Sequence, residues 1–317
     1  MTQWFSERLA YLATRIGLHA GCLAVRLLPR QCLYDFADML ASIGFYLFRG
    51  FRTRSLRNLS VALGAHLDGT ATREIVRQSL QNFFRDFVEI GVGLVMSSNE
   101  WRSEIPIIGR ENLDAAINKG KGVIVLSAHL GNFFLIGSRL ALEGYSVHVL
   151  VNQPNNGQFA KFMDDYRAKV QQKTIHARPR RDALRELGRV LRSNGLAIMI
   201  ADEHRGGSGI HVPFFGHTVL ARRGPATLAL RTGAAVVPVY LVRGDRGLKL
   251  VIEPELQLVR AERTKAEIRE NTLRITQWLE QTVRAYPGQW NWMNIHWQDL
   301  GKNSTVAKEQ PVERVPY

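Results

Sequence analysis

The sequence predicts an α/β fold in which a mostly parallel sheet is flanked by helices, and three observations support this fold class. The chain has 317 residues, of which 45% are hydrophobic and 22% charged, so it can bury the core of one large domain or of two small ones. After Pro106, short β-rich runs alternate with helical segments, a pattern typical of layered α/β proteins. Before that point the apolar spacing is helical.

The β-rich runs and the helical segments between them define the expected elements of the layered region. Strands are expected at residues 123–128, 146–151, 196–201, 235–241 and 248–252. Helices are expected at residues 132–142, 157–171, 180–193, 224–231 and 264–285.

The first hundred residues are predicted to form amphipathic helices. Up to Phe51, leucines and aromatic residues alternate with arginines, a composition that favours membrane contact. The uncharged run 39–48 has about half of the roughly 20 residues that a spanning helix needs, so we expect helices that lie in the membrane interface. In residues 72–96, the apolar spacing predicts a helix that packs on the core.

This pattern divides the chain into three parts. Residues 1–100 form an N-terminal helical, membrane-associating region, and residues 101–300 form the α/β domain that carries the chemistry. Residues 301–317 form a polar tail, which we expect to be frayed.

The chain carries a formal net charge of +14, and arginine dominates it, since no lysine precedes Lys119. Arginine forms bidentate hydrogen bonds with phosphates and carboxylates, so the positive charge indicates an anionic partner. Candidates are a membrane surface, a phosphorylated lipid, an acidic carrier protein and nucleic acid. Nucleic acid is the weakest of these, because the charge is spread along the chain without a DNA- or RNA-binding signature. A basic surface that only maintains solubility is the alternative.

The strongest chemical signal is the sequence Val123-Ile-Val-Leu-Ser-Ala-His129-Leu-Gly-Asn-Phe-Phe134, in which an apolar strand ends in a histidine and Gly-Asn opens a helix. Sites in open α/β sheets form beyond the carboxyl ends of strands, where a histidine can take a proton from an attacking hydroxyl. Gly131 and Asn132 are candidates for oxyanion or substrate binding, because glycine admits close approach and N–H groups at a helix start hold negative charge. The alternative is a strand-end histidine that bonds only to backbone groups.

A second expected strand, 196–201, is followed by Asp202 and Glu203. If the two strands end at the same edge of a parallel sheet, one of these carboxylates approaches His129, fixes its tautomer and stabilises its protonated form. Asp202 is favoured and Glu203 is the reserve, since consecutive residues on a strand point to opposite sides. The alternative for either acid is a helix cap or a surface ion pair.

Further candidates for substrate binding are a glycine and three arginines. The glycine-rich segment that ends at Gly216 is predicted to be a loop that lets a ligand approach the main chain. Arg222 and Arg223 directly precede a predicted helix and are candidates for clamping a phosphate. Arg167, in another predicted helix, completes this set.

No metal and no cofactor are predicted. His204, His211 and His217 lie near one another in the sequence, but nothing in their spacing fixes the geometry of a metal site. Cys22 and Cys32 form no CxxC pair, which disfavours a zinc knuckle or a disulfide framework.

The chain resembles the bacterial lipid A biosynthesis acyltransferase family, the late lauroyl/myristoyl-type enzymes of the lysophospholipid acyltransferase superfamily. The resemblance covers nearly the whole chain and rests on elements that occur in the order of the family. They are Arg57-Asn58-Leu59, Ser127-Ala-His129-Leu-Gly131-Asn132, Ala201-Asp202, Val212-Pro-Phe-Phe-Gly216, Leu228-Ala229 with Thr232-Gly-Ala-Ala-Val-Val-Pro238, and Pro287-Gly-Gln-Trp290-Asn-Trp292. Each is weak alone, but together in this order they are specific.

The resemblance implies a glycerolipid acyltransferase-like fold and an O-acyltransferase. The enzyme would move a fatty acyl group from a thioester, on acyl carrier protein or coenzyme A, to a hydroxyl of a membrane glycolipid. The expected acceptor is a lipid A precursor, as in lipopolysaccharide biosynthesis, and a lysophospholipid is the alternative. The resemblance further implies a protein on the cytoplasmic face of the inner membrane, peripheral or held by its N-terminal region. His129 is the expected base, and N–H groups near Gly131 or Gly216 are the expected oxyanion donors.

Two positions depart from the family pattern. The family has an acid five residues after the histidine, where this chain has Phe134, and it has an arginine after the next strand, where this chain has Asn152. Either Asp202 or Glu203 replaces the missing acid, or the chemistry is slow, or the protein is a lipid-binding or assembly protein without turnover. General-base help contributes about 10²–10⁴-fold to a rate, and part of it is lost without the carboxylate.

Overall fold

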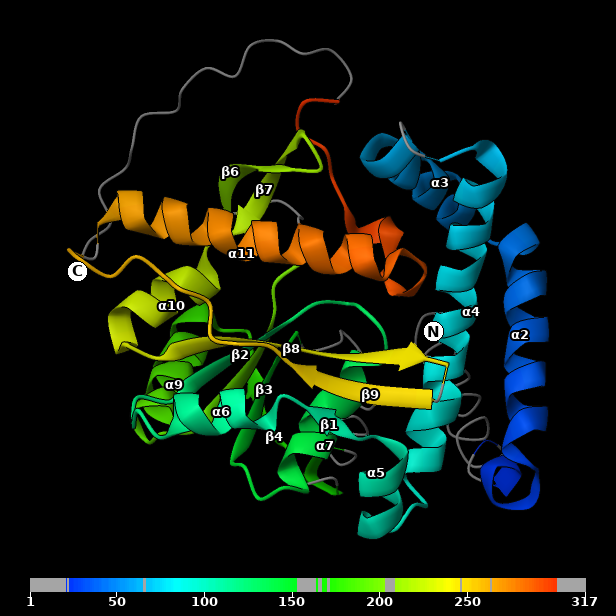
Figure 1. The fold of residues 1–317 in the computed structure, drawn as a ribbon, viewed down its shortest axis with the longest axis horizontal. Coiled ribbons are helices and arrows are strands. Elements are labelled where there is room, and N and C mark those ends of the chain that lie inside the picture. Colours follow the sequence, from blue (N-terminus) through cyan, green and yellow to red (C-terminus); the bar gives the residue numbers. More distant parts are fainter. Residues whose placement is uncertain are drawn as a thin grey trace, which may run out of the picture.

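The computed structural model describes residue 21 and residues 23–64, 67–152, 164, 167–169, 172–202, 209–245, 247–262 and 264–300. Its centre is a seven-stranded sheet with the strand order β1-β9-β8-β2-β5-β3-β4 (Figure 1). All neighbouring strands in it are parallel except β8 and β9. The strands are β1 (Ile107–Ile108), β2 (Val123–Ser127), β3 (Val147–Val151), β4 (Lys173–His176), β5 (Leu196–Ile200), β8 (Ala235–Gly244) and β9 (Gly247–Ile252). The predicted α/β class with a mostly parallel sheet is confirmed.

All five predicted strands are present, within a few residues of their expected ends. Two short edge strands, β1 and β4, were not predicted. The predicted glycine-rich loop before Gly216 is wrong in part, because β6 (Gly209–Phe214) and β7 (His217–Arg222) form an antiparallel hairpin. The physical reason is a period-2 pattern, in which the buried Val212 and Phe214 alternate with the exposed His211 and Pro213.

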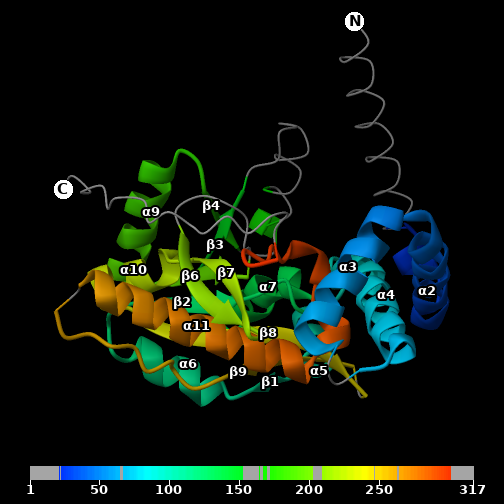
Figure 2. The same ribbon diagram turned by 90° about the horizontal axis from the view of Figure 1, so that it is seen from above.

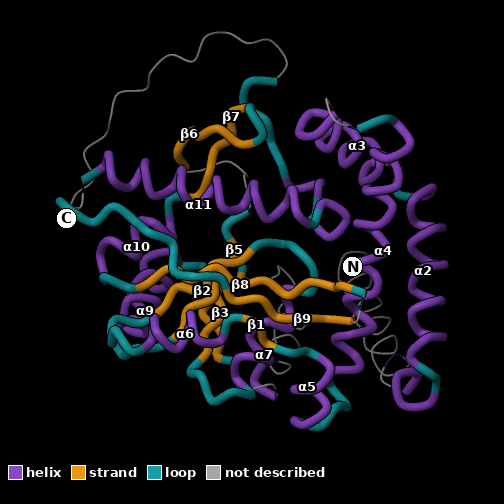
Figure 3. The backbone as a smooth tube through the Cα atoms, in the orientation of Figure 1, coloured by secondary structure: helices purple, strands orange, loops and turns teal. Residues whose placement is uncertain are grey.

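Helices cover both faces of the sheet, as the purple segments of Figure 3 show. One face carries α9, α10 and α11, and the other carries α5, α6 and α7. The bounds of these helices are α5 (Ser98–Glu104), α6 (Arg110–Ile117), α7 (Ile136–Ala141), α9 (Arg180–Arg192), α10 (Gly224–Thr232) and α11 (Lys265–Ala285). A 3₁₀ turn, η2 (Phe133–Leu135), replaces the beginning of the helix expected at 132–142.

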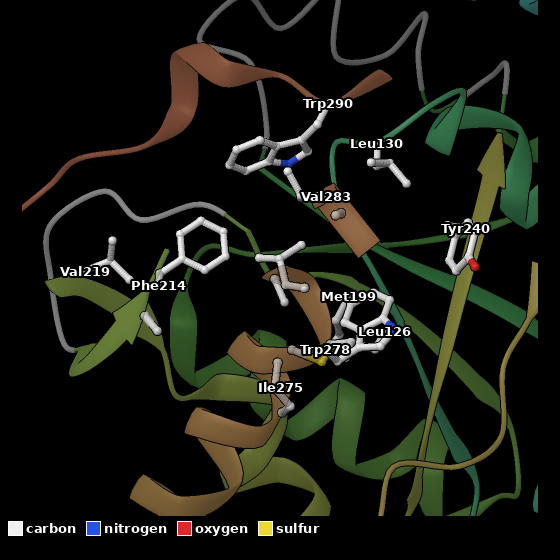
Figure 4. Close-up of a cluster of buried hydrophobic side chains, with 14 of the residues drawn as sticks. Leu126, Leu130, Met199, Phe214, Val219, Tyr240, Ile275, Trp278, Val283 and Trp290 are labelled. Atoms are coloured by element: carbon white, nitrogen blue, oxygen red, sulfur yellow. The ribbon is translucent and has the colours of Figure 1, made fainter. Parts of the chain in front are cut away.

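The apolar core follows from the alternation of side chains along the central strands. On β2, Ile124 and Leu126 join the cluster under α9, α10 and α11, while Val123 and Val125 join the cluster under α5, α6 and α7. Every residue of β2 is buried, as expected for a parallel strand between two helical layers. Figure 4 shows the first cluster, in which Trp278 of α11 lies beside Leu126 and Met199.

The described part of the N-terminal region, residues 23–64 and 67–100, is mostly helical, as predicted, and packs against the α/β layers, while residues 1–20 lie outside the described residues. Its helices are α2 (Arg30–Leu47), α3 (Arg49–Leu63) and α4 (Gly69–Gly93). They stand together at one end of the molecule, while α9 lies at the other end (Figures 1 and 2). Phe45, Leu59 and Leu80 from these helices belong to the same apolar cluster as the sheet residues above, which fixes the helices against the α/β layers.

Within the described residues, no helix is both long and apolar enough to cross a membrane. Two predicted elements lie outside the described residues in whole or in large part. The tail 301–317 is one, and the helix expected at 157–171 is the other, of which Asp164 and the helical residues 167–169 are described.

Candidate active site

The sheet brings the two predicted strand-end residues, His129 and Asp202, together. β2 and β5 are parallel neighbours, with Ser127 paired to Ile200. The chain leaves both strands at the same edge of the sheet. His129 lies two residues beyond Ser127, and Asp202 lies two residues beyond Ile200. The carboxyl edge of a parallel sheet is where sites of α/β proteins form.

The Asp202 carboxylate holds His129 through two hydrogen bonds. His129 Nδ1 lies 2.8 Å from Asp202 Oδ1, and the backbone N–H of His129 donates to Oδ2 at 2.8 Å. The predicted contact between these residues is therefore present. Because Nδ1 is engaged with Asp202, general-base work falls to Nε2, and the side chain is 21% exposed.

Trp290 completes the surroundings of the carboxylate. Its indole Nε1 donates to Asp202 Oδ2 at 2.8 Å. Asp202 is fully buried, which by itself would raise its pKa, but the charge of His129 and the hydrogen bonds from His129 and Trp290 hold the pKa below its ordinary value. The C-terminal sequence motif contains Trp290 but predicts no role for it, since a buried tryptophan is ordinarily a core residue.

The segment around Trp290 also fixes the backbone of the histidine turn. Gly131 N–H donates to the carbonyl of Gln289 at 2.8 Å, and Asn291 N–H donates to the carbonyl of His129 at 3.2 Å. Leu130 and Trp290 form an isolated antiparallel bridge. The C-terminal motif therefore acts as a strand-like brace for the turn that carries the histidine.

The structure does not support the two glycines as oxyanion donors. The N–H of Gly131 is engaged with Gln289, and the glycine is needed because φ is +54° and a Cβ would lie 2.0 Å from the carbonyl oxygen of Leu241. Gly216 lies exposed in the β6–β7 turn with φ +77°, and it does not line the cavity that contains His129. Gly131 permits close packing of the turn on β8, and Gly216 permits the hairpin turn.

Asn132, another predicted site residue, is fully buried, and its side-chain amide bonds to α4. Its Nδ2 donates to Glu89 Oε2 at 2.9 Å and to the carbonyl of Asp86 at 3.1 Å. Arg243 of β8 donates to Glu89 Oε1 at 2.6 Å and lies 3.3 Å from Asp86 Oδ1. Burial and the neighbouring Glu89 charge raise the pKa of Asp86 well above its ordinary value. This network locks the histidine turn between α4 and β8.

His129 opens onto a cavity of about 1620 Å³. Towards the N-terminal helices, its walls are aromatic, with Phe48, Phe51, Phe83 and Phe84. Elsewhere its walls carry arginines, among them the predicted Arg167, Arg222 and Arg223, together with Arg178 and Arg180. A cavity of this size, apolar in one part and basic in another, matches a molecule with acyl chains and an anionic group.

The predicted arginines differ in their surroundings. Arg167 is mostly buried and pairs with Asp164 at 2.9 Å. Arg222 ends β7 and is exposed, and Arg223 is the N-cap residue of α10. Glu203, the reserve for the carboxylate, lies outside the described residues.

The two departures from the family pattern both line the cavity. The Phe133 ring stands edge-on to His129 at 4.8 Å between centroids, and Phe134 stacks on Phe133 at 4.1 Å. Asn152 follows β3 on the cavity wall. An aromatic pair therefore occupies the place of the missing acid, while Asp202 provides the carboxylate that touches the imidazole.

A histidine held by a buried carboxylate on the wall of a large, partly apolar cavity is the arrangement of an α/β enzyme that uses a general base. Residues 3–299 match the bacterial lipid A biosynthesis acyltransferase family, so the chain belongs to this family and is an acyltransferase. The resemblance seen in the sequence motifs is confirmed.

Curated relatives match over nearly their whole length. The chain is 25% identical over 292 residues to a phosphatidylinositol mannoside acyltransferase of Mycobacterium tuberculosis (strain CDC 1551 / Oshkosh), covering 90% of this chain and 89% of the relative. It is 24% identical over 289 residues to the protein of that name from Mycolicibacterium smegmatis, covering 90% and 91%. It is 22% identical over 288 residues to the lipid A biosynthesis palmitoleoyltransferase of Escherichia coli (strain K12), covering 90% of each.

Replacing Asp202 with asparagine is expected to lower kcat by about 10²–10⁴-fold with little change in KM, since the imidazolium loses its buried counter-charge. The lowered pKa of Asp202 means that its ionised form stabilises the fold above about pH 4, and that this contribution is lost as pH falls through the lowered pKa. The difference in unfolding free energy between wild type and Asp202→Asn should therefore shrink as pH falls below about 4. A kcat within about threefold of wild type would contradict the role of Asp202.

Phe134→Glu restores the acid of the family pattern, and we expect it not to raise turnover. Asp202 already holds Nδ1 at 2.8 Å, and a glutamate would break the ring stack on Phe133. The measurement is kcat for Phe134→Glu beside Phe134→Leu, which removes the ring without adding charge. A kcat above wild type for the glutamate variant alone would show that Asp202 does not replace the family acid.

Proposed function

We propose that the protein transfers a fatty acyl group from a thioester to a hydroxyl of an anionic membrane glycolipid. The observation that carries this proposal is the His129–Asp202 pair on the wall of a cavity that is aromatic in one part and lined by arginines in another. The aromatic part suits acyl chains, and the arginines suit phosphate groups of the glycolipid or of the donor.

The proposed reaction is a base-assisted attack on the thioester. The acceptor hydroxyl oxygen attacks the carbonyl carbon while its proton passes to Nε2 of His129, and Asp202 stabilises the resulting imidazolium. The tetrahedral intermediate collapses as the C–S bond breaks. The departing thiolate takes the proton back from His129, so an ester and a free thiol are formed and the histidine is neutral again.

Side chains of the cavity wall are the proposed oxyanion donors, since the N–H of Gly131 is bonded to Gln289. Asn152 lines the cavity at the position where the family has an arginine, and its amide can donate to a developing negative charge. Arg222 and Arg223 line the same cavity and add positive charge. With an uncharged amide at this position, the oxyanion site would carry less positive charge than a site with the family's arginine.

The acceptor is proposed as a glycolipid because the relatives named above are acyltransferases of phosphatidylinositol mannoside and of lipid A. A lipid A precursor is the acceptor that the sequence motifs favour, and a mannosylated phosphatidylinositol is the one that the relatives of higher identity favour. The alternative of a protein that binds lipid without turnover rested on Phe134 and Asn152, and the Asp202 contact argues against the part that rested on Phe134.

His129→Ala is expected to abolish acyl transfer while the protein stays folded, because the variant lacks the base at Nε2. The assay supplies a radiolabelled acyl thioester to a lipid A precursor, to a phosphatidylinositol mannoside and to a lysophospholipid in separate reactions, with thermal unfolding as the folding control. Wild-type turnover in His129→Ala would overturn the mechanism. Transfer to the lysophospholipid alone would overturn the glycolipid acceptor.

We also propose that the protein lies on the cytoplasmic face of the inner membrane, held by the N-terminal helices. α2 buries Leu33, Ala37 and Phe45 but exposes an opposite face, here called the α2 apolar face. This face consists of Phe36, Met39, Ile43, Tyr46 and Leu47, of which Tyr46 and Leu47 are each 71% exposed. Phe83 and Phe87 of α4 are exposed as well. An apolar face of this kind is typical of helices that bind the membrane interface.

Replacing Phe36, Ile43 and Tyr46 together with serine is expected to weaken binding to anionic phospholipid vesicles by at least about 100-fold, because each large apolar side chain contributes about 1.5–3 kcal/mol on burial. Point changes are preferred to truncation, since α2 also packs against the core. Ile43→Ser and Ile108→Ser form a matched pair, because both residues are about half exposed and only Ile43 lies on the α2 apolar face. Equal vesicle sedimentation of these two single variants would contradict the proposal.

A further inference from the structure

The outer face of α9 carries a row of arginines, here called the α9 arginine stripe. Arg181, Arg185, Arg189 and Arg192 follow one another at helical spacing, and all four are exposed. They lie opposite the buried face of the helix, which Leu187 and Leu191 form with other apolar residues. From Arg181 to Arg192 the stripe is about 16 Å long, given 1.5 Å per residue.

The stripe keeps a positive charge despite acids on the same helix. α9 contains five arginines and two acids in Arg180–Arg192. Arg185 lies 3.5 Å from Asp182, and Arg189 pairs with Glu186, while the arginine side chains remain 68% and 73% exposed. Ion pairs this exposed contribute little stability and exchange readily for an external carboxylate. The outer face of α9 is therefore available to an acidic partner.

The position of α9 links the stripe to the active site. Ala183, Leu184 and Leu187 on the inner face of the helix line the cavity that contains His129. Arg178 and Arg180, at the beginning of the helix, line the same cavity. A molecule bound along the stripe would therefore bind a helix whose other side lines the catalytic cavity.

The stripe is also remote from the surface proposed to contact the membrane. α2 and α4 stand at one end of the molecule, and α9 stands at the other end (Figures 1 and 2). The cavity reaches both regions, since Phe48 and Phe83 line one part of it and Arg180 and Leu184 another. The cavity therefore extends from the helices proposed to contact the membrane to the helix that carries the stripe.

We propose that the α9 arginine stripe docks an acidic carrier protein that presents the acyl thioester. This inference rests on the proposed function, because it assigns the donor of that reaction. A row of arginines about 16 Å long is longer than a binding site for the phosphates of a small thioester has to be. Arg178 and Arg180, which line the cavity, can bind such phosphates. Several exposed arginines in a row instead match the carboxylates along a helix of an acidic protein.

The test compares two charge-reversed variants that are matched in spacing. Arg185→Glu with Arg189→Glu alters the stripe, and Arg73→Glu with Arg77→Glu alters two exposed arginines at the same spacing on α4. Arg77 lies 3.6 Å from Glu74 three residues before it, as Arg189 pairs with Glu186. Kinetics are measured with one acyl chain carried either by acyl carrier protein or by coenzyme A, and binding of the carrier protein without acyl chain is measured directly.

With the carrier-protein donor, the stripe variant should lose at least about tenfold in kcat/KM through KM, and more at low salt, since charges at the rim of an interface act on association. With coenzyme A as carrier, kcat/KM should stay within about twofold, and the α4 variant should resemble wild type with both donors. Direct binding of the carrier protein should weaken in parallel, which keeps the proposal testable even if neither donor is turned over and the proposed function fails.

Three results would overturn the docking proposal. One is a stripe variant that binds the carrier protein as tightly as wild type. Another is an equal loss with both donors, which would place the arginines in the active site. The third is a loss of binding to anionic vesicles without a change for the carrier protein, which would assign the stripe to the membrane.

Discussion

A buried carboxylate that accepts three hydrogen bonds is the constraint on which the site depends. Asp202 has no exposed surface, and its oxygens receive the imidazole and the backbone N–H of His129 and the indole N–H of Trp290. A buried charge of this kind is tolerated only when it is fully hydrogen-bonded. The requirement joins three segments that are far apart in the sequence, and it fixes the histidine in one orientation and one tautomer.

A second buried network holds the same turn from the other side. Glu89 of α4 receives Asn132 and Arg243, and Arg243 also lies beside Asp86. Buried ion pairs contribute little net stability, but removing one partner leaves an uncompensated charge, so such a network penalises any other arrangement. The N-terminal helices are therefore part of the catalytic architecture as well as a candidate membrane surface.

The two positions that depart from the family pattern, Phe134 and Asn152, differ in which nearby residues supply the missing charge. Phe134 stands where the family has an acid, and the carboxylate that contacts the imidazole belongs to Asp202, two residues beyond the neighbouring strand β5. Asn152 stands where the family has an arginine, and the positive charge of the cavity comes from Arg178, Arg180 and other arginines of its wall. Replacement of this kind is possible because the cavity collects side chains from many segments.

The sequence by itself determined five of the seven strands of the sheet, the fold class and the family, because apolar runs and motif order are local patterns. It also placed His129 and Asp202 at two strand ends, and parallel pairing of β2 with β5 was enough to bring them together. Only the tertiary structure decided the roles of Gly131, Asn132 and Trp290, since each depends on a partner more than 40 residues away. The reason is that burial and hydrogen-bond partners are set by packing between distant segments, on which local sequence carries no information.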